Sequence, residues 1–361
     1  AIGASALSHN TTGANNTAVG RTALEENTTA TANTALGFGS LRANTDGHSN
    51  TGAGQCALNG NTTGDHNTAV GFLALDANTT ANNNTAVGSN ALCTNIEGHC
   101  NTAVGFNALL KNTVQRNTAV GAYAALCNTT GQQNVAIGYY TLDANTTGAC
   151  NVSIGGNLGN NTTGGGNIAI GNSALANNST CSDNVAVGRA AAQETNSAHG
   201  IVAIGALALC KNTSGDNNTA VGFCTLECNV SGASNVALGV KALAANTTGG
   251  TNVAIGVTAL AANTEAGSNV AVGTGAMCTT TTGAGNTALG ECAMKANTTG
   301  TLNVAVGHRS LCANTTGYGN ISIGQRSMKS NTEGFRNIAV GQFSLCDNTT
   351  GDYNTALGYA A

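Results

Sequence analysis

Residues 101–105 read Asn-Thr-Ala-Val-Gly, and variants of this pentapeptide return through the whole 361-residue chain. The second position is Thr, Val or Ile, and the fourth is almost always Val, Ile or Leu. The closing glycine occurs twenty-two times, at intervals of seventeen residues apart from two intervals of sixteen. Helical hairpin repeats need about 33 residues or more, so this shorter period predicts one coil of a β-solenoid. We number the columns of each repeat from this glycine, column 0, to column 16.

The composition excludes several classes of protein. Charged residues make up 8% of the chain and the net charge is −4, which does not suit a surface that binds phosphate groups. There are 50 Gly but no Pro, which excludes collagen, and the low charge does not suit a disordered chain. The longest apolar run, residues 201–210, is about half of a membrane span. We therefore expect no nucleic-acid partner and no membrane-spanning segment.

The pentapeptide predicts a short strand in every coil. Column 14 is β-branched throughout and column 16 is almost always aliphatic, as at Val253 and Ile255. Side chains two apart on a strand share a face, so we expect both columns to point into the coil, opposite the Leu or Met of column 4. The Asn residues of columns 7 and 13 are expected to hydrogen-bond from coil to coil as ladders.

Together these elements predict an all-β chain. It would be a single continuous parallel β-solenoid (β-roll) rod over residues 1–361, with about twenty-two coils of seventeen residues. At about 4.8 Å per coil, the rod would be about 105 Å long. Both ends of the chain stop within the repeat and carry no cap, which predicts a segment of a longer fibre or end-to-end joining of copies.

Column 15 is Ala in nearly every repeat, and it is expected to face outward because it lies between columns 14 and 16. A solvated strand face would also accept Lys, Glu, Arg or Gln. The persistence of a small residue therefore predicts close packing against other copies of the rod. Exposed alanine preserved by recent duplication is the alternative. The candidate lateral interface consists of Ala18, Ala69, Ala103, Ala136, Ala203, Ala254, Ala305 and Ala356.

The Asn-Val-Ala-Ile-Gly motifs at residues 134–138 and 252–256 resemble the head repeats of trimeric autotransporter adhesins. The longer unit that begins at residue 101 is similar to seventeen-residue repeats of phage tail fibres and related surface fibres. The resemblance covers essentially the whole chain and implies a left-handed β-roll in which three chains pack side by side. Two features depart from it: adhesin head repeats are usually shorter, and thirteen Cys are foreign to typical bacterial heads.

The cysteines lie in variable columns, and their density suggests an oxidising compartment outside the cell. Two pairs share a fourteen-residue spacing. Flat strands would hold such partners too far apart, so a disulfide needs a corner between them or a partner on a neighbouring chain. Inert small residues are the alternative. The candidate disulfide residues are Cys210, Cys224, Cys278 and Cys292.

Asn-x-Ser/Thr sequons recur at column 7 and would be glycan acceptors in a secreted eukaryotic protein. An Asn ladder followed by a Thr turn produces the same motif without any glycan, and an inward ladder Asn cannot carry a sugar. The candidate glycosylation residues are Asn27, Asn61, Asn145, Asn246, Asn297 and Asn348.

No constellation of residues predicts catalysis or a metal site. The six His are scattered, no CxxC motif occurs, and no carboxylate–His–nucleophile spacing supports a triad. We therefore expect neither an enzyme nor a bound cofactor.

The sequence predicts a structural shaft or filament outside the cell or on a virion, assembled laterally as a homotrimer. Two alternatives remain open. An adhesin would bind host glycans or surfaces. An ice-binding solenoid would use the Thr of column 8, such as Thr28 and Thr62, although neighbouring Thr in columns 8 and 9 point in different directions.

Overall fold

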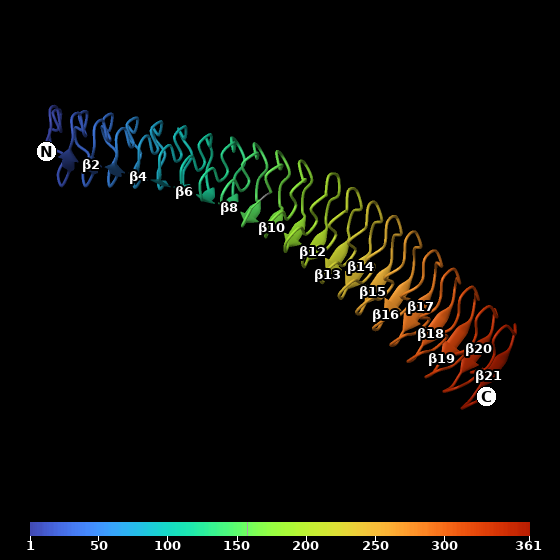
Figure 1. Cartoon of the computed structure of the whole chain (residues 1–361). Coiled ribbons are helices and arrows are strands. Elements are labelled where there is room, and N and C mark those ends of the chain that lie inside the picture. The colour runs from blue at the N-terminus through green and yellow to red at the C-terminus, as the bar shows by residue number, and fades with distance from the viewer. Residues whose placement is uncertain (157) are drawn as a thin grey trace. The chain divides into compact units, whose positions relative to one another are not determined.

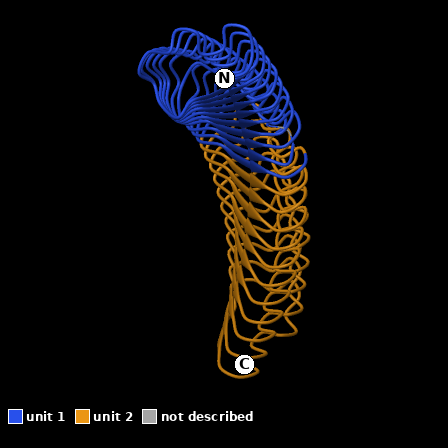
Figure 2. Ribbon diagram, turned by 90° about the vertical axis from the view of Figure 1, so that its left-hand side faces the viewer, with its two compact units in different colours: residues 1–172, 176–182 blue, residues 173–175, 183–361 orange. Residues whose placement is uncertain are grey.

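A computed structural model describes residues 1–156 and 158–361, and it confirms the predicted fold class. The described residues form three-residue strands joined by turns, with no helix among them. Each strand covers columns 14 to 16 of one repeat. The chain divides into two compact units (Figure 2): residues 1–172 with 176–182, and residues 173–175 with 183–361.

In the first unit, ten parallel strands lie side by side (Figure 1). Each pairs in register with the strand one repeat later, so that Ala18 lies beside Ala35 and like residues stack on like. These strands are β1 (Thr17–Val19), β2 (Thr34–Leu36), β3 (Thr51–Ala53), β4 (Thr68–Val70), β5 (Thr85–Val87), β6 (Thr102–Val104), β7 (Thr118–Val120), β8 (Val135–Ile137), β9 (Val152–Ile154) and β10 (Ile168–Ile170).

The second unit repeats this arrangement with eleven strands. Its register is equally regular, since Val253 pairs with Val270 and Ile255 with Val272. These strands are β11 (Val185–Val187), β12 (Val202–Ile204), β13 (Thr219–Val221), β14 (Val236–Leu238), β15 (Val253–Ile255), β16 (Val270–Val272), β17 (Thr287–Leu289), β18 (Val304–Val306), β19 (Ile321–Ile323), β20 (Ile338–Val340) and β21 (Thr355–Leu357).

The pleat of the strands places column 15 inside the coil and columns 14 and 16 outside, so the predicted orientation is wrong. Ala254 is fully buried, whereas Val253 and Ile255 on either side of it both reach solvent. The central residue is buried in each strand from β1 to β20. The alternation itself was predicted, but its phase is shifted by one residue, which moves every strand side chain to the other face.

The narrow interior of the coil explains this phase. Column 4 is an inward Leu or Met, as predicted, and column 3 is a buried Ala in most coils. Gly52 stands in column 15 of its coil, and a Cβ added to it would lie 3.1 Å from the carbonyl oxygen of Ala57 and 3.5 Å from Cγ of Leu41. One carbon in column 15 therefore fills the space between the strand and the side chain of column 4. A β-branched side chain there would overpack the coil.

Each exception in column 15 coincides with a hydroxyl residue in column 3 of the same repeat. Ser153 lies 2.6 Å from Thr141, measured between their hydroxyl oxygens, and the Ser310 hydroxyl donates to that of Ser322 at 2.7 Å. At the third exception, Gly52, the Ser40 hydroxyl donates to the Gly52 carbonyl at 2.9 Å. Columns 15 and 3 thus face each other inside the coil, and their buried hydroxyls are paired.

The two Asn ladders are confirmed. In column 7, the Asn61 amide donates to Oδ1 of Asn44 at 2.7 Å and to the carbonyl of Gly64 at 3.0 Å. In column 13, Oδ1 of Asn50 accepts the backbone N–H of Asn67 at 2.9 Å. Because these amides are fully buried, each ladder satisfies polar groups that would otherwise be costly to bury.

The glycine of column 0 is required by its conformation and by its neighbour in the next coil. Gly71 has φ +135°, and a Cβ on it would lie 2.6 Å from the carbonyl oxygen of Gly88. An L-residue is therefore excluded both by the backbone angle and by the close approach of the next coil. Gly71 thus forms a corner that directly follows strand β4.

Candidate lateral interface

The alanines predicted to form a lateral interface do not lie on the surface. They pack inside their own coils, so a neighbouring chain cannot reach them. That prediction is wrong because the strand pleat is inverted relative to the one assumed. Ala18, Ala69, Ala103, Ala136, Ala203, Ala254 and Ala305 are buried, and Ala356, in the last strand, is half-buried.

The outward face of the strands instead carries no charge along both units, and its column 16 is aliphatic in every strand. We call columns 14 and 16 of β1–β21 the strand face. Ile204 is 40% exposed and Leu238 is 46% exposed, and none of the strand residues in these columns is charged. Other strongly exposed members are Val19, Leu36, Val70, Val120, Ile137, Val236, Ile255, Leu289, Ile321, Ile323, Ile338 and Leu357.

The first seven strands differ from most later ones in column 14. There the residue is Thr in every strand from β1 to β7, while Val and Ile predominate from β8 onward. The outward Thr therefore forms a file beside the aliphatic file of column 16 in the first unit.

A second set of apolar side chains borders the strand face at column 1, directly after the glycine corner. These residues are exposed and several are aromatic: Phe38, Phe72, Phe106, Tyr139, Phe223, Val240, Val257 and Tyr359. Sequence reasoning overlooked them, because it treated column 1 as a loosely specified turn position. Their common column in the repeat was the available signal.

The sequon asparagines serve as ladder residues. Asn27, Asn61, Asn145, Asn246 and Asn297 are fully buried, and Asn348 is half-buried. The Nδ2 atom of each donates to the carbonyl three residues ahead. The folded structure contradicts these residues as glycan carriers, because the nitrogen that a glycan would occupy is enclosed and hydrogen-bonded.

The four candidate disulfide cysteines are free thiols in this structure, so their pairing stays a prediction. Burial, reinforced by a hydrogen bond to Glu227 and the charge of that residue, raises the pKa of Cys224 to about 11. Burial also raises the pKa of Cys210 and of Cys278. Cys210 lies near enough to Cys224 to contribute to its raised pKa, and Cys292 does the same for Cys278.

Columns 2 and 5, which hold these cysteines, lie next to each other on the surface. A Cβ added to Gly39, in column 2, would lie 3.5 Å from Sγ of Cys56 and 3.7 Å from Oδ1 of Asn59, which stand in columns 2 and 5 of the next coil. The turn thus supplies the corner that a disulfide between these columns needs.

The threonines of column 8 are engaged within the solenoid. The hydroxyls of Thr28, Thr62, Thr146 and Thr298 donate to the carbonyl of the residue in the same column of the next coil, at 2.9 to 3.4 Å. This column therefore does not present a free hydroxyl array.

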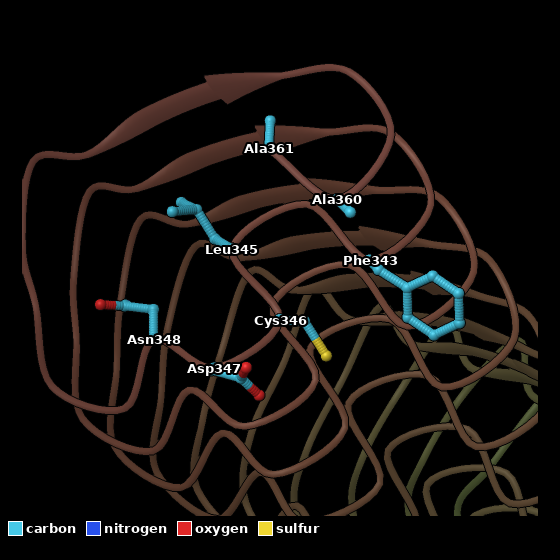
Figure 3. A pocket seen from close by; sticks show the side chains of 7 residues that line it. All are labelled: Phe343, Leu345, Cys346, Asp347, Asn348, Ala360 and Ala361. Carbon is cyan, nitrogen blue, oxygen red and sulfur yellow. The ribbon is translucent and has the colours of Figure 1, made fainter.

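A hollow of about 470 Å³ opens at the last coil (Figure 3). Leu345 and Asn348 line it, together with Phe343, Cys346, Asp347, Ala360 and Ala361. Leu345 and Asn348 belong to columns 4 and 7, which the next coil covers elsewhere in the chain. The hollow is therefore the uncovered interior of the last coil rather than a ligand site.

Two further absences concern the described residues alone. They contain no group of three His, Cys, Asp or Glu side chains placed to hold a metal ion. They also include no helix that could cross a membrane.

Comparison with protein-family models gives no match, and comparison with curated protein sequences gives none at a significant level. The strand face and the resemblance of the repeat to surface fibres are therefore the features from which a function can be proposed.

Proposed function

We propose that this chain is a segment of a structural fibre shaft, outside the cell or on a virion surface, in which copies pack laterally through the strand face. The observation that carries this proposal is an outward face that is free of charge along both units, with an aliphatic residue in column 16 of every strand. The resemblance to trimeric surface fibres supplies the number of copies, three.

The size of the strand face suits such packing. Three residues per strand and about 4.8 Å between strands give about 500 Å² for each unit. This is about the size of the largest apolar patch on a typical monomer, about 300–600 Å², and such a patch is often functional. A standard interface buries about 800 Å² per partner, so the strand face of each unit would supply more than half of one.

The regularity of the strand face favours copies of the same chain as the partner. The exposed side chains recur once per coil, in register from strand to strand. A second copy has this spacing automatically, so its β-branched side chains would interdigitate along the whole contact. An unrelated partner would have to match the same period.

Mass measurement by light scattering tests the proposal. We expect the parent chain to have about three times the 35.3 kDa of one copy. The double variant Ile204→Lys with Leu238→Lys places two charges on the strand face and should lower the mass to that of a single copy. Leu302→Lys is the control, because Leu302 is exposed in column 12, away from the strand face, and should leave the mass unchanged. A single-copy mass for the parent, or an unchanged mass for the double variant, would contradict the proposal.

Ice binding is the second candidate, and the outward Thr file of β1–β7 favours it. Thr68 and Val70 illustrate the pair of files, one of hydroxyls and one of methyls, on a regular face. Thermal hysteresis separates the two functions. A single-copy chain that shows hysteresis, lost in Thr68→Lys, would favour ice over a lateral partner.

A further inference from the structure

An aromatic cluster on the first unit is not explained by a role as a shaft. Phe106, Tyr123, Tyr139 and Tyr140 come from three successive coils and contact one another. The rings of Tyr123 and Tyr140 are stacked with centroids 4.4 Å apart, and Tyr139 stands perpendicular to Tyr140 at 4.6 Å. The whole chain has only 6 Phe, 6 Tyr and no Trp, so four rings in one place are a marked concentration.

The outermost ring of this cluster is open to solvent. Tyr139 is 67% exposed, which is unusual for a side chain that could pack against its neighbours. Its position in the following coil, column 1, is Gly156, and a Cβ on Gly156 would meet no heavy atom within 4 Å. No side chain from that position therefore covers Tyr139.

The coil after Tyr139 also departs from the regular stacking. A Cβ on Gly138 would lie 3.4 Å from its nearest neighbour, the nitrogen of Gly155, whereas the same atom on Gly71 would lie 2.6 Å from the next coil. The glycine corner is thus looser here than elsewhere. The coil that follows Tyr139 therefore has no side chain in column 1 and packs less closely at its glycine corner.

A carboxylate stands in the same coil as Tyr139 and Tyr140. Partial burial of the Tyr140 ring contributes most to the raised pKa of its hydroxyl, the neighbouring tyrosines add to it, and nearby Asp143 makes a smaller contribution. Asp143 also lines a surface hollow of about 240 Å³, together with Gly159, Asn160 and Ala176. The aromatic cluster therefore has a carboxylate near it, and that carboxylate borders a small hollow.

We propose that this aromatic cluster binds a neutral pyranose ring of a glycan, with Tyr139 stacked on the C–H face of the sugar and Asp143 accepting hydrogen bonds from its hydroxyls. The polarised C–H groups of a pyranose suit the negative face of an aromatic ring. Hydroxyl donors suit a carboxylate, and such charge-assisted bonds are the stronger ones. The site is one-sided and shallow, so binding by one copy should be weak and should gain from several copies on one fibre.

The site lies mostly away from the strand face. Tyr139 stands in column 1, which borders the strand face, whereas Tyr123 and Tyr140 stand in column 2 and Asp143 in column 5. Subunit number is therefore measured beside sugar binding for every variant, so that a loss of binding is distinguished from a loss of assembly.

The test uses the full chain and neutral oligosaccharides of glucose, galactose and mannose, with binding followed by saturation-transfer NMR. We expect millimolar affinity for at least one of these sugars and a loss of about tenfold or more in Tyr139→Ala. Asp143→Asn, which keeps the shape but removes the charge, should also weaken binding. Tyr353→Ala is the matched control, because Tyr353 is 64% exposed in a separate aromatic cluster of the second unit.

Two results would overturn the proposal. One is the absence of binding of the parent chain to every sugar. The other is equal affinity of the parent and Tyr139→Ala, with both at the same subunit number. If Tyr139→Ala loses sugar binding and Asp143→Asn does not, the role proposed for the carboxylate is wrong and the role proposed for the ring is supported.

Discussion

The orientation of the strands can be tested by adding bulk and charge to the two sides of β15. Ala254→Leu adds three carbons to column 15, and Ile255→Lys adds a charge to column 16. Ala254 is fully buried and Ile255 is 36% exposed. If the alanine faces inward, the apparently conservative change is the damaging one and the charged change is tolerated.

The expected magnitudes follow from the space around each residue. In column 15 a single Cβ already contacts the carbonyl of column 3 and the Leu of column 4, as the positions around Gly52 show. By the same spacing, the neighbours of Ala254 are Ala259 and Leu243, both fully buried. Carbons beyond Cβ must displace one of them, so Ala254→Leu should cost about 3 kcal/mol. Ile255→Lys loses part of an already incomplete burial while the lysine stem remains on the surface, so about 1 kcal/mol is expected.

Hydrogen exchange measured by mass spectrometry is the suitable assay, because repeat proteins open locally rather than as one unit. In the peptide that contains β15, about 3 kcal/mol corresponds to roughly a hundredfold faster exchange, and about 1 kcal/mol to roughly fivefold. Repetition at two protein concentrations separates packing within the coil from association between copies. The double variant Ala254→Ser with Ala242→Ser is the control, since it copies the natural Ser322–Ser310 pair. Faster exchange in Ile255→Lys than in Ala254→Leu would refute the inward alanine.

Three further predictions concern the ladder, the glycine corner and a buried thiol. Asn246→Ala should lower the local free energy of unfolding by about 2–5 kcal/mol, measured by hydrogen exchange, because Asn246 donates to Asn229 at 2.7 Å and to Gly249 at 2.9 Å. Gly71→Ala should be strongly destabilising in thermal melts, and more so than Gly156→Ala, which has the same φ of +135° but no neighbour within 4 Å; equal melting temperatures would contradict the contact. At pH 9, Cys224 should react with iodoacetamide at least tenfold more slowly than a thiol of ordinary pKa, because its raised pKa of about 11 keeps it protonated, and Glu227→Gln should speed the reaction. The folded chain holds this proton where the unfolded chain releases it, so this thiol lowers the free energy of unfolding as the pH rises from about 9 to about 11.

The period of the repeat predicted the fold class, the strand positions, the inward Leu and Met of column 4 and both Asn ladders. Each of these predictions depends on a residue type that is favoured in only one environment, as glycine is at a positive φ. The direction of the strand residues was harder to predict, because alternation alone does not say which of two faces is buried. Thr and Val at column 14 suit either face, and β-branching reports a strand rather than its inside.

The sequence did contain a signal for the correct direction, in the exceptions rather than in the consensus. Ser153 and Ser322 replace the usual Ala of column 15, and Thr141 and Ser310 stand in column 3 of the same repeats. Coupled changes from apolar to hydroxyl residues indicate contact in a dry interior, since a lone buried hydroxyl is costly. The aromatic cluster was equally readable, because Phe106 and Tyr139 share column 1. The wider spacing between Gly138 and Gly155 could not be predicted from the sequence, since it depends on the backbone of one irregular coil.

Charged residues are absent from several columns of the repeat, and their absence has two physical causes. Columns 3, 4, 7, 13 and 15 lack charged residues because they are buried in the coil, and column 0 because only glycine fits there. Columns 14 and 16 lack them although they are partly exposed to water in a single copy. Nothing within one coil requires this, because a strand residue that faces solvent accepts Lys or Glu at little cost. Burial against another surface, as we propose above, would account for this absence, and the unbroken repeat of these columns favours a second copy of the same chain as that surface.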